Sequence, residues 1–570
     1  MSITPFLRRA LLPALLALSG ASLVACGGGG SSSSGTSTPT GTVNVAVTDG
    51  PGDDYSHVWV TIKAIAFHTD PNVEWSASDA SWQTVTLAAP QTIDLTQLNN
   101  GGLNHLFQNM NLPAGSYHQI RFFIVAPEAD LTASAQAQSS SSGPLQWNDQ
   151  VEYQLGASTL EAPLEIAFPG RGIVLNGSFT VSAGSTLNLA VDFDLEHSVV
   201  PFRHNSLRYF ALKPVLHYYD LNKSGAITGK LDPSTFCTTA ITATCTYNFI
   251  VKAELLNADG SRHYVEHATT VHGDGSFSLY PLAVSDASGN PLSYDVLIRG
   301  RQMTTKLITG VPVSAGTTPL SNPTLLQASG NIALSASSAE YTAQFASPLA
   351  PLSSGDVLFQ QTLPGSGAVP YEVRWGLTDP FTGKLLSPMP LENGDIEVAA
   401  YNAGNTLSFS SVTPTEGSGD YSVSVNEAMP RYFTRSANVQ LNAVATGSST
   451  TFTPGTPTLD SGVSSGTVSG TITVANSASY DRAVLVIAHL GSIATTVDIS
   501  SQLGNASIPF SISGLPAGST AIPQPGAYYY AYLRLWKSSD VIAKKTVAIP
   551  YLGVIDLRTT DTATFNLTLL

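Results

Sequence analysis

The sequence predicts an all-β protein made of tandem β-sandwich domains that follow a signal peptide and a flexible linker. Short segments alternate apolar and polar residues with a period of two, which is typical of half-buried strands. Turn residues recur at short intervals, as in TDGPGDD, LPAGS and FPGRG, and long helical periodicity is almost absent. The stretch from Leu98 to Asn109 could form one short helix, although Gly101 and Gly102 weaken it. Together these observations favour β-sandwiches.

The clearest strand pattern is TLNLAVDFDLEH, which begins at Thr186. Successive side chains of a strand point to opposite faces, so one face of this segment is apolar and the other is polar. The apolar face carries Leu187, Leu189, Val191, Phe193 and Leu195, and the polar face carries Asn188, Asp192, Asp194 and Glu196. Further strands begin at Gly41 (GTVNVAVTDG), His57 (HVWVTIKAIAF) and His118 (HQIRFFIVA).

Residues 1–25 have the organisation of an export signal peptide. Arg8 and Arg9 precede an apolar run that ends at Ala25. This run is too short for a transmembrane helix, which needs about 20 apolar residues. The last residues of the signal, with the cysteine that follows, read Leu-Val-Ala-Cys and resemble the lipobox of bacterial lipoproteins.

The lipobox resemblance implies that diacylglycerol is attached to Cys26 and that the signal is cut before it. Two or three acyl chains make a stable anchor, because each buried CH₂ contributes about 0.8 kcal/mol. Residue 27 is Gly and not the Asp that favours inner-membrane retention, so the resemblance implies an anchor in the outer membrane of a Gram-negative cell, on its periplasmic face or at the cell surface. A free cysteine in an ordinary signal peptide is the alternative. Residues 26–40 then form a Gly- and Ser-rich tether of about 20 Å root-mean-square span.

The composition suggests a chain of several domains with an acidic surface. The mature chain from Cys26 to Leu570 has 545 residues, which suggests three to five domains. It has 23 basic and 40 acidic residues, a formal charge of −17. No cluster of Lys and Arg occurs, so we expect no nucleic-acid partner, because phosphate contacts need such clusters.

Two cysteines remain after Cys26, at Cys237 and Cys245. An exported protein folds in an oxidising compartment, which favours a disulfide between them. Two thiolates without nearby His or further Cys would leave a zinc shell half empty, so a metal site is disfavoured here.

Several motifs of the first domain resemble those of bacterial DUF4382 domains, and they occur in the same order. These motifs are AVTDGPGDDYSHVWVTIKAIAFH, TIDLTQL, LPAGSYHQIRFFI, LNLAVDFDLEHSV and YFALKPVLH. The resemblance covers about residues 41–222. It implies an exported β-domain of unknown function, common on lipoproteins, with no catalytic residue to transfer.

The rest of the chain contains internal repeats. SGAITGKL from Ser224 and SSGTVSGTITV from Ser464 are each followed by an apolar strand and, later, by a turn that leads into another strand. These segments resemble the prealbumin-like sandwiches called carboxypeptidase regulatory-like domains. The predicted modules are 223–327, 328–462 (the faintest copy) and 463–570. The resemblance implies non-catalytic companion domains, and some relatives with this sandwich bind carbohydrate.

Two groups of carboxylates could meet if the first turn lies beside the strand that begins at Thr186. Hard oxygen ligands suit Ca²⁺, but the spacing does not match an EF-hand, and Gly and Asp are routine turn residues. We therefore favour a plain turn and expect no metal or other cofactor, with calcium as the open alternative. The turn carries Asp49, Asp53 and Asp54, and the strand carries Asp192, Asp194 and Glu196.

Three histidines lie close together in the sequence at His263, His267 and His272. On a strand, the first two would share a face but lie about 13 Å apart at 3.3 Å per residue. They therefore cannot bind one zinc ion, and we expect solvated strand histidines.

No catalytic motif stands out. There is no G-x-S-x-G elbow, phosphate loop or dinucleotide fingerprint. Asp192 and Asp194 would lie about 6.6 Å apart along a strand, a separation that glycosidases use, but exposed strand carboxylates are far commoner than catalytic ones. Trp75 and Trp82 lie in a polar segment that we expect to be exposed. The aromatic face of Tyr528, Tyr530 and Tyr532 could stack on sugars, although core packing is favoured.

These observations favour a membrane-anchored envelope lipoprotein that acts as a non-enzymatic binding or structural module. The expected partners are the membrane, through the lipid, and a glycan or another envelope protein. An extracytoplasmic hydrolase of polysaccharide or peptide is the alternative.

Overall fold

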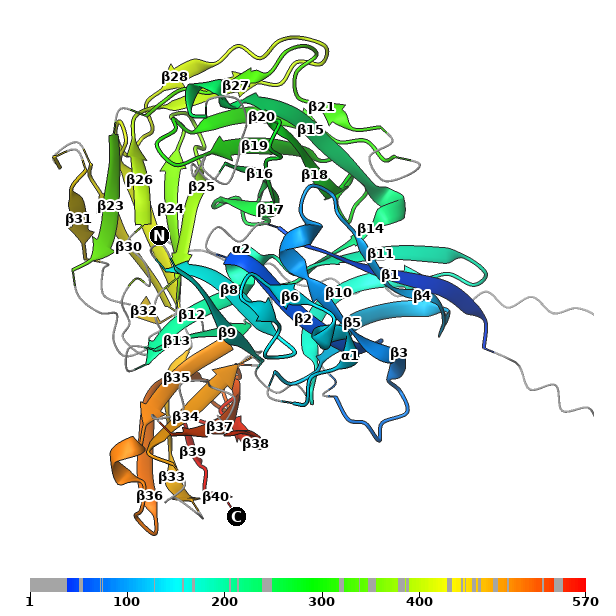
Figure 1. Cartoon of the computed structure of the whole chain (residues 1–570), viewed down its shortest axis with the longest axis vertical. Helices are drawn as coiled ribbons and strands as arrows, with labels where there is room; N and C mark the ends of the chain where they lie inside the picture. The colour runs from blue at the N-terminus through cyan, green and yellow to red at the C-terminus, as the bar shows by residue number, and fades with distance from the viewer. Residues whose placement is uncertain are drawn as a thin grey trace, which may run out of the picture. The chain divides into compact units, whose positions relative to one another are not determined.

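The chain is almost entirely β, as the sequence predicts (Figure 1). Residues Pro39–Leu570 form one compact unit with several small sheets that pair into sandwiches. None of the helices in the described part of the chain has the length and apolar character that crossing a bilayer requires. The computed structural model describes residues 38–50, 55–71, 73, 75–127, 129–155, 158–166, 170–204, 207–212, 215–237, 249–316, 322–337, 339–346, 355–377, 385, 389–427, 433–441, 444–445, 447–453, 458–459, 463–474, 480–489, 492–524, 527–537 and 547–569.

The N-terminal domain, strands β1–β14, has two large sheets around one core and a separate two-stranded sheet, β6-β7. One sheet has the order β14-β11-β1-β4, and the other has the order β10-β5-β2-β8-β9-β13-β12 with β3 added beside β2. Val43, Val45 and Val47 of β1 pack in this core with Ile65 and Phe67 of β2. The elements are β1 (Thr40–Thr48), β2 (Tyr55–His68), β3 (Gln83–Asp94), η1 (Leu95–Leu98), β4 (Asn104–Pro113), β5 (Gly115–Ile124), α1 (Ala133–Gln136), β6 (Ser139–Ser140), β7 (Gly143–Pro144), β8 (Gln150–Leu155), β9 (Ser158–Ile166), β10 (Ile173–Val181), β11 (Thr186–Asp192), α2 (Leu195–Ser198), β12 (Val199–His204), β13 (Leu207–Leu212) and β14 (His217–Asp220).

The short helix expected from Leu98 to Asn109 is wrong. A 3₁₀ turn ends at Leu98, and strand β4 then pairs antiparallel with β1. This pairing places Leu106 and Phe107 in the core of the N-terminal domain. Tertiary pairing therefore decides the structure of a segment whose local propensity was weak.

The remainder of the chain repeats one strand order three times, in sandwich 1 (β15–β22), sandwich 2 (β23–β32) and sandwich 3 (β33–β40). In one sheet of each sandwich, the first strand lies between an antiparallel and a parallel partner: β18-β15-β21, β26-β23-β31 and β36-β33-β39. The facing sheets have the orders β17-β16-β19-β20, β25-β24-β29-β30 and β35-β34-β37-β38. The middle copy, faint in the sequence, therefore has the same topology as the other two.

The strands of sandwich 1 are β15 (Ser224–Asp232), β16 (Ile250–Leu256), β17 (His263–Thr270), β18 (Ser276–Ala283), β19 (Ser293–Arg299), β20 (Lys306–Pro312), β21 (Thr324–Leu325) and β22 (Ile332–Ala333), with η2 (Leu221–Lys223) before β15 and η3 (Pro233–Thr235) after it. Those of sandwich 2 are β23 (Ala339–Phe345), β24 (Gly355–Thr362), β25 (Pro370–Leu377), β26 (Met389–Asn393), β27 (Ile396–Ala400), β28 (Ser410–Val412), β29 (Tyr421–Glu427), β30 (Phe433–Val439), β31 (Ser449–Phe452) and β32 (Thr458–Leu459). Those of sandwich 3 are β33 (Ser464–Val474), β34 (Arg482–His489), β35 (Ser492–Asp498), β36 (Ile508–Ala517), β37 (Tyr528–Trp536), β38 (Val547–Asp556), β39 (Thr562–Thr564) and β40 (Leu567–Leu569), with η5 (Ser500–Gln502).

Glycines in the first strand of sandwiches 1 and 3 allow close backbone approach. A Cβ on Gly225 would lie 2.1 Å from the carbonyl oxygen of Ser314. A Cβ on Gly470 would lie 1.7 Å from the carbonyl oxygen of Phe565. A side chain at either position would separate neighbouring segments, which explains why the repeats open on glycine-containing strands.

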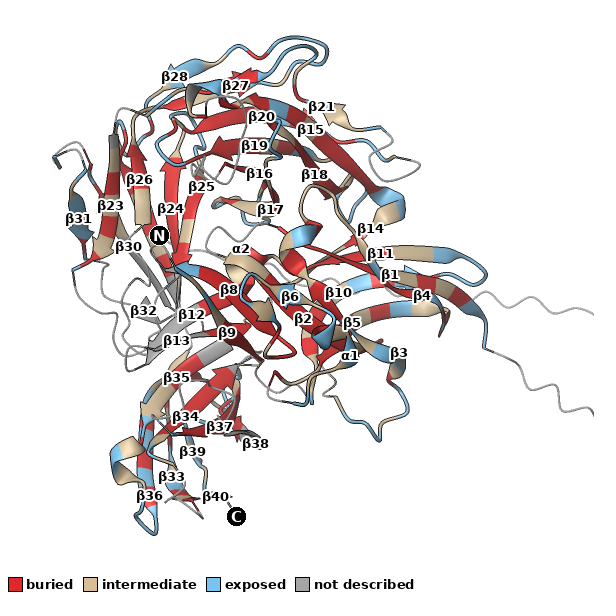
Figure 2. Cartoon of the chain, viewed as in Figure 1, coloured by how far each residue is buried: buried red, intermediate tan, exposed pale blue. Residues whose placement is uncertain are grey.

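Sandwiches 1 and 2 share a sheet. The hairpin β27–β28 is inserted between β26 and β29, and β27 pairs in parallel with β20 of sandwich 1. Leu297 and Leu307, on β19 and β20, pack in the core of sandwich 2. Figure 2 shows that these strands are buried along most of their length. A sheet therefore continues past the predicted boundary between residues 327 and 328, and the module boundaries themselves stay predictions.

Candidate functional site

The candidate site is built around helix α2, which four side-chain hydrogen bonds hold in place. β11 ends at Asp192, whose Oδ1 accepts from the Asp194 N–H (3.0 Å). Asp194 lies in the left-handed region with φ 37°, and its Oδ1 accepts from the His197 N–H (3.3 Å). Asp49 Oδ1 accepts from the Leu195 N–H (3.1 Å), and Ser198 Oγ accepts from the Val215 N–H (3.1 Å). A four-residue helix has almost only unsatisfied backbone donors, so these caps determine its position.

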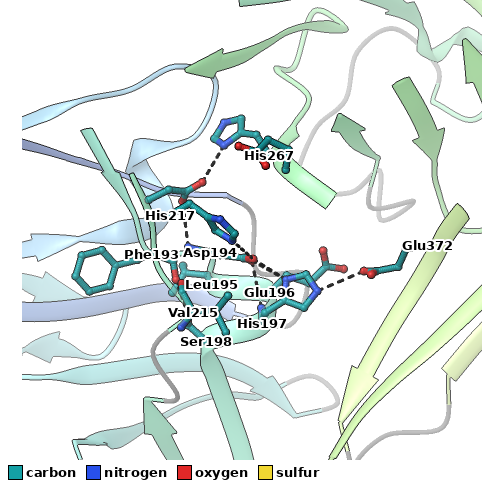
Figure 3. A network of polar contacts seen from close by, with 12 residues as sticks. Phe193, Asp194, Leu195, Glu196, His197, Ser198, Val215, His217, His267 and Glu372 are labelled. Atoms are coloured by element: carbon teal, nitrogen blue, oxygen red, sulfur yellow. Dashed lines mark hydrogen bonds and ion pairs between the residues drawn. The ribbon is translucent and has the colours of Figure 1, made fainter. Parts of the chain in front are cut away.

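His197 lies between two carboxylates (Figure 3). Its Nδ1 is 2.7 Å from Asp194 Oδ2, and its Nε2 is 3.3 Å from Glu372 Oε1 on β25 of sandwich 2. Burial alone would lower the pKa of His197, but the charge of Asp194 and the hydrogen bonds to both carboxylates raise it well above its usual value. Burial would raise the pKa of Asp194, but the charge and hydrogen bond of His197 lower it to about 2. The geometry therefore favours an imidazolium that bridges the N-terminal domain and sandwich 2.

Lys252, on β16, is fully buried and pairs with two carboxylates. Its Nζ lies 3.1 Å from Glu196 Oε2 on α2 and 3.6 Å from Glu372 Oε1. Arg299 Nη2 on β19 lies 3.4 Å from Glu196 Oε1. Burial would lower the pKa of Lys252, but Glu196 and Glu372 outweigh burial and raise it. A charged lysine is therefore stabilised where an isolated one would lose its proton.

Glu254 lies two residues along β16, on the same face as Lys252. Its Oε2 accepts a hydrogen bond from the Glu372 N–H (3.1 Å). Burial and the neighbouring charge of Glu372 raise the pKa of Glu254 well above its usual range. The pKa of Glu372 itself is lowered, since the contacts with His197 and Lys252 outweigh its burial. Two adjacent carboxyl groups thus have pKa values pushed apart by their surroundings.

Asp49, Asp192 and His267 form the other end of the cluster. Asp192 Oδ2 lies 2.9 Å from His267 Nδ1 on β17 of sandwich 1. Asp49 is completely buried, and burial followed by repulsion from Asp192 raises its pKa well above its usual range. We call the whole group the ionic cluster: Asp49, Asp192, Asp194, Glu196, His197, Lys252, Glu254, His267, Arg299 and Glu372.

The structure brings together four of the six carboxylates singled out in the sequence, Asp49, Asp192, Asp194 and Glu196. Asp53 and Asp54 lie outside the described residues. The expectation of exposed strand carboxylates is wrong, because β11 ends at Asp192 and sandwich 1 residues contact this face. In the described part of the chain, no three His, Cys, Asp or Glu side chains are arranged to hold a metal ion.

The expectation of solvated histidines is wrong for two of the three. His267 is 2% exposed because Asp192 faces it, and His263 is stacked on Tyr371 of β25 with ring centroids 3.8 Å apart. His272 is exposed in the turn after β17. Elements distant in sequence cover the strand face, which the alternation pattern does not reveal.

Sequence reasoning missed His197, Lys252, Glu254, Arg299 and Glu372. A signal was present, because Lys252 interrupts the apolar strand FIVKAELL and Glu372 stands in the strand YEVRWGL. A charged residue inside an otherwise apolar strand is almost never fully buried unless it is paired. Such residues therefore indicate a second covered face and a partner of opposite charge.

One serine–histidine contact resembles part of a hydrolytic triad. His68 Nε2 lies 2.9 Å from Ser81 Oγ. The other ring nitrogen faces the backbone of Asp70, with the N–H at 2.9 Å and the carbonyl oxygen at 3.0 Å. Ser81 donates its own proton to Asp79 Oδ1 (2.6 Å). The contact therefore lacks the orienting carboxylate that a triad uses to activate its nucleophile.

The expectation that Trp75 and Trp82 are exposed is wrong. Trp82 is 5% exposed and packs with Ala64, Ala66 and Phe123, and the partly buried Trp75 packs against the same cluster. The loop after β2 returns over the outer face of β2 and β5, which provides the apolar cover.

Core packing is confirmed for the aromatic strand β37. Tyr529 points into sandwich 3, while Tyr530 and Tyr532 pack on the opposite face with Ala211 of the N-terminal domain. Arg171 lies over the Tyr530 ring at 4.8 Å, and Arg534 pairs with Glu165. This face is therefore occupied by the chain itself.

The lipidation and disulfide predictions fall mainly outside the described residues. Cys26 and Cys245 both lie outside them, and Cys237 is disulfide-bonded. The pairing of Cys237 with Cys245 and the lipid on Cys26 stay predictions.

The family model described as a domain of unknown function, DUF4382, matches residues 40–214. This segment comprises β1–β13, so the N-terminal domain is a DUF4382 domain, and further β-rich domains follow it. The curated proteins include no match to the chain.

Proposed function

We propose that the chain is a membrane-anchored lipoprotein of the bacterial envelope that acts as a non-enzymatic binding or structural module. In this proposal Cys26 carries the lipid, residues 26–40 form the tether, and the anchor lies in the outer membrane. Sandwiches 1–3 are of the carboxypeptidase regulatory-like type, which the thrice-repeated strand order supports.

The observation that carries the proposal is the pairing inside the ionic cluster. Two of its carboxylates, Glu196 and Glu372, are bound to Lys252 of another domain, and Asp192 lies 2.9 Å from His267 of sandwich 1. A catalytic acid or base must instead be within reach of a substrate proton. Buried pairs that link domains suit a rigid scaffold, which presents a binding surface without a chemical step.

Two assays on the chain from Gly41 onward test the proposal: binding to a glycan array together with an envelope-protein pulldown, and a turnover screen on the same glycans and on peptides. We expect retention of a glycan or an envelope protein without turnover, because the buried carboxylates of Glu196 and Glu372 are already paired with Lys252. The opposite result, which would support a hydrolase, is turnover abolished by one Asp→Asn or Glu→Gln change in a variant that still folds.

A further inference from the structure

We propose that the ionic cluster is a pH-sensitive joint that holds the N-terminal domain against sandwiches 1 and 2 at neutral and mildly acidic pH and loosens as the pH becomes alkaline. This inference is independent of what the domains bind.

The joint consists of ionisable groups from every element that meets there. Three carboxyl groups of the ionic cluster come from the segment 192–196, and the other three are those of Asp49, Glu254 and Glu372. The facing groups are Asp49 just after β1, Asp192 on β11, Asp194 at the N-cap of α2, Glu196 and His197 on α2, His217 and Tyr219 on β14, Lys252 and Glu254 on β16, Arg262 just before β17, His263 and His267 on β17, Asp295 and Arg299 on β19, and Tyr371 and Glu372 on β25.

The carboxyl groups outnumber the permanent cations of this joint. Three permanent cations reach the carboxylates of Glu196 and Glu372. Lys252 pairs with both, Arg299 pairs with Glu196, and Arg262 Nη1 lies 3.9 Å from Glu372 Oε2. Buried like charges destabilise one another unless protons or cations neutralise them. The joint therefore depends on bound protons.

Loss of the proton on His197 has the clearest structural consequence. Its two ring nitrogens face Asp194 of the N-terminal domain and Glu372 of sandwich 2, at 2.7 and 3.3 Å. Neutral imidazole has one N–H, so deprotonation removes the donor to one of the two carboxylates and the positive charge from both. An unpaired buried carboxylate is costly, and separation of the domains would rehydrate it.

The direction of the pH effect follows from the raised pKa of His197. A raised pKa in the folded state contributes stability that is complete below the unfolded value, about 6.5, and is lost as the pH rises through the folded value. The raised pKa values of Asp49 and Glu254 act in the same direction. Their contribution to stability begins to fall when the pH rises above the ordinary pKa range of a carboxyl group. The lowered pKa values of Asp194 and Glu372 act oppositely, because their contribution is lost only when acid protonates them.

Urea unfolding of the full mature chain in detergent, from pH 5 to 9, tests the joint. We expect the unfolding equilibrium constant of the wild type to rise about tenfold or more between pH 6.5 and 9, since each pKa unit corresponds to a factor of ten. His197→Gln should flatten this alkaline rise, whereas the matched variant of an exposed histidine, His272→Gln, should retain it. Hydrogen exchange of β16 and β17 amides, corrected for intrinsic rates, should increase over the same pH range.

A wild-type profile that is flat from pH 6.5 to 9, or a His197→Gln profile as steep as that of the wild type, overturns the proposal. If His197→Gln does not fold, NMR titration of the His197 ring in the wild-type chain decides the question. An imidazole that titrates near 6.5 contradicts the joint, and one that titrates well above that value together with faster β16 exchange supports it. Glu372→Gln provides an independent variant, because it should weaken the pH dependence by removing one of the two carboxylates.

Discussion

Replacing Lys252 with methionine is expected to reduce the free energy of unfolding by about 3–5 kcal/mol, because removal of one partner from a buried ion pair leaves an uncompensated buried charge. Lys252 is completely buried between Glu196 and Glu372. Without its ammonium group, the two carboxylates would repel each other. Urea unfolding monitored by circular dichroism measures the loss. Adding Glu196→Gln should recover part of it, because the carboxylate nearest to the missing lysine is then neutral, and the recovery is incomplete because Arg299 also pairs with Glu196.

Lys230→Met is the matched control for this experiment. Lys230 also pairs with a carboxylate, Asp274, at 3.2 Å, but the side chains are 44% and 61% exposed. Exposed pairs contribute little to stability, so this variant should unfold like the wild type. A Lys252→Met chain that is as stable as the Lys230→Met chain would show that the cluster does not hold the domains together.

Replacing Cys26 with serine is expected to abolish fatty-acid incorporation and to move the protein from the membrane fraction to the soluble fraction. The thiol is the proposed attachment atom, and each buried CH₂ of the acyl chains contributes about 0.8 kcal/mol to anchoring. Metabolic labelling with a radioactive fatty acid, followed by membrane fractionation, measures both effects.

Cys237→Ser is the control for the anchor, because it also replaces one cysteine but leaves the lipobox intact. This variant should incorporate label and remain with the membrane, whatever its effect on the disulfide. Label that persists in Cys26→Ser, or a wild-type chain without label, would contradict lipidation at Cys26.

Much of the fold follows from local pattern. Alternation predicted β1, β2, β5 and β11, and the paired motifs at Ser224 and Ser464 indicated sandwiches that prove to share one strand order. These features depend on the two-residue period of strands and on turn chemistry, both of which can be recognised in a single sequence.

The candidate site could be predicted only in part. The sequence leaves open whether Asp49 approaches Asp192 and Asp194, and in the structure these carboxyl groups lie close enough to repel one another. The cross-domain partners of the neighbouring Glu196 and His197 cannot be predicted, because Lys252 and Glu372 are distant in sequence and reach these residues only when separate domains meet. Alternation shows that a strand has a polar face, but it does not show whether water or another domain covers that face.

A double-mutant cycle between Glu196 of the N-terminal domain and Lys252 of sandwich 1 tests the central claim most directly. Their charged atoms lie 3.1 Å apart across the domain boundary. If the ionic cluster joins the domains, Glu196→Gln and Lys252→Met should be coupled by about 1–3 kcal/mol, since contacting residues of one network are not additive. Effects that add to within about 0.5 kcal/mol, as for distant and independent sites, would contradict the claim.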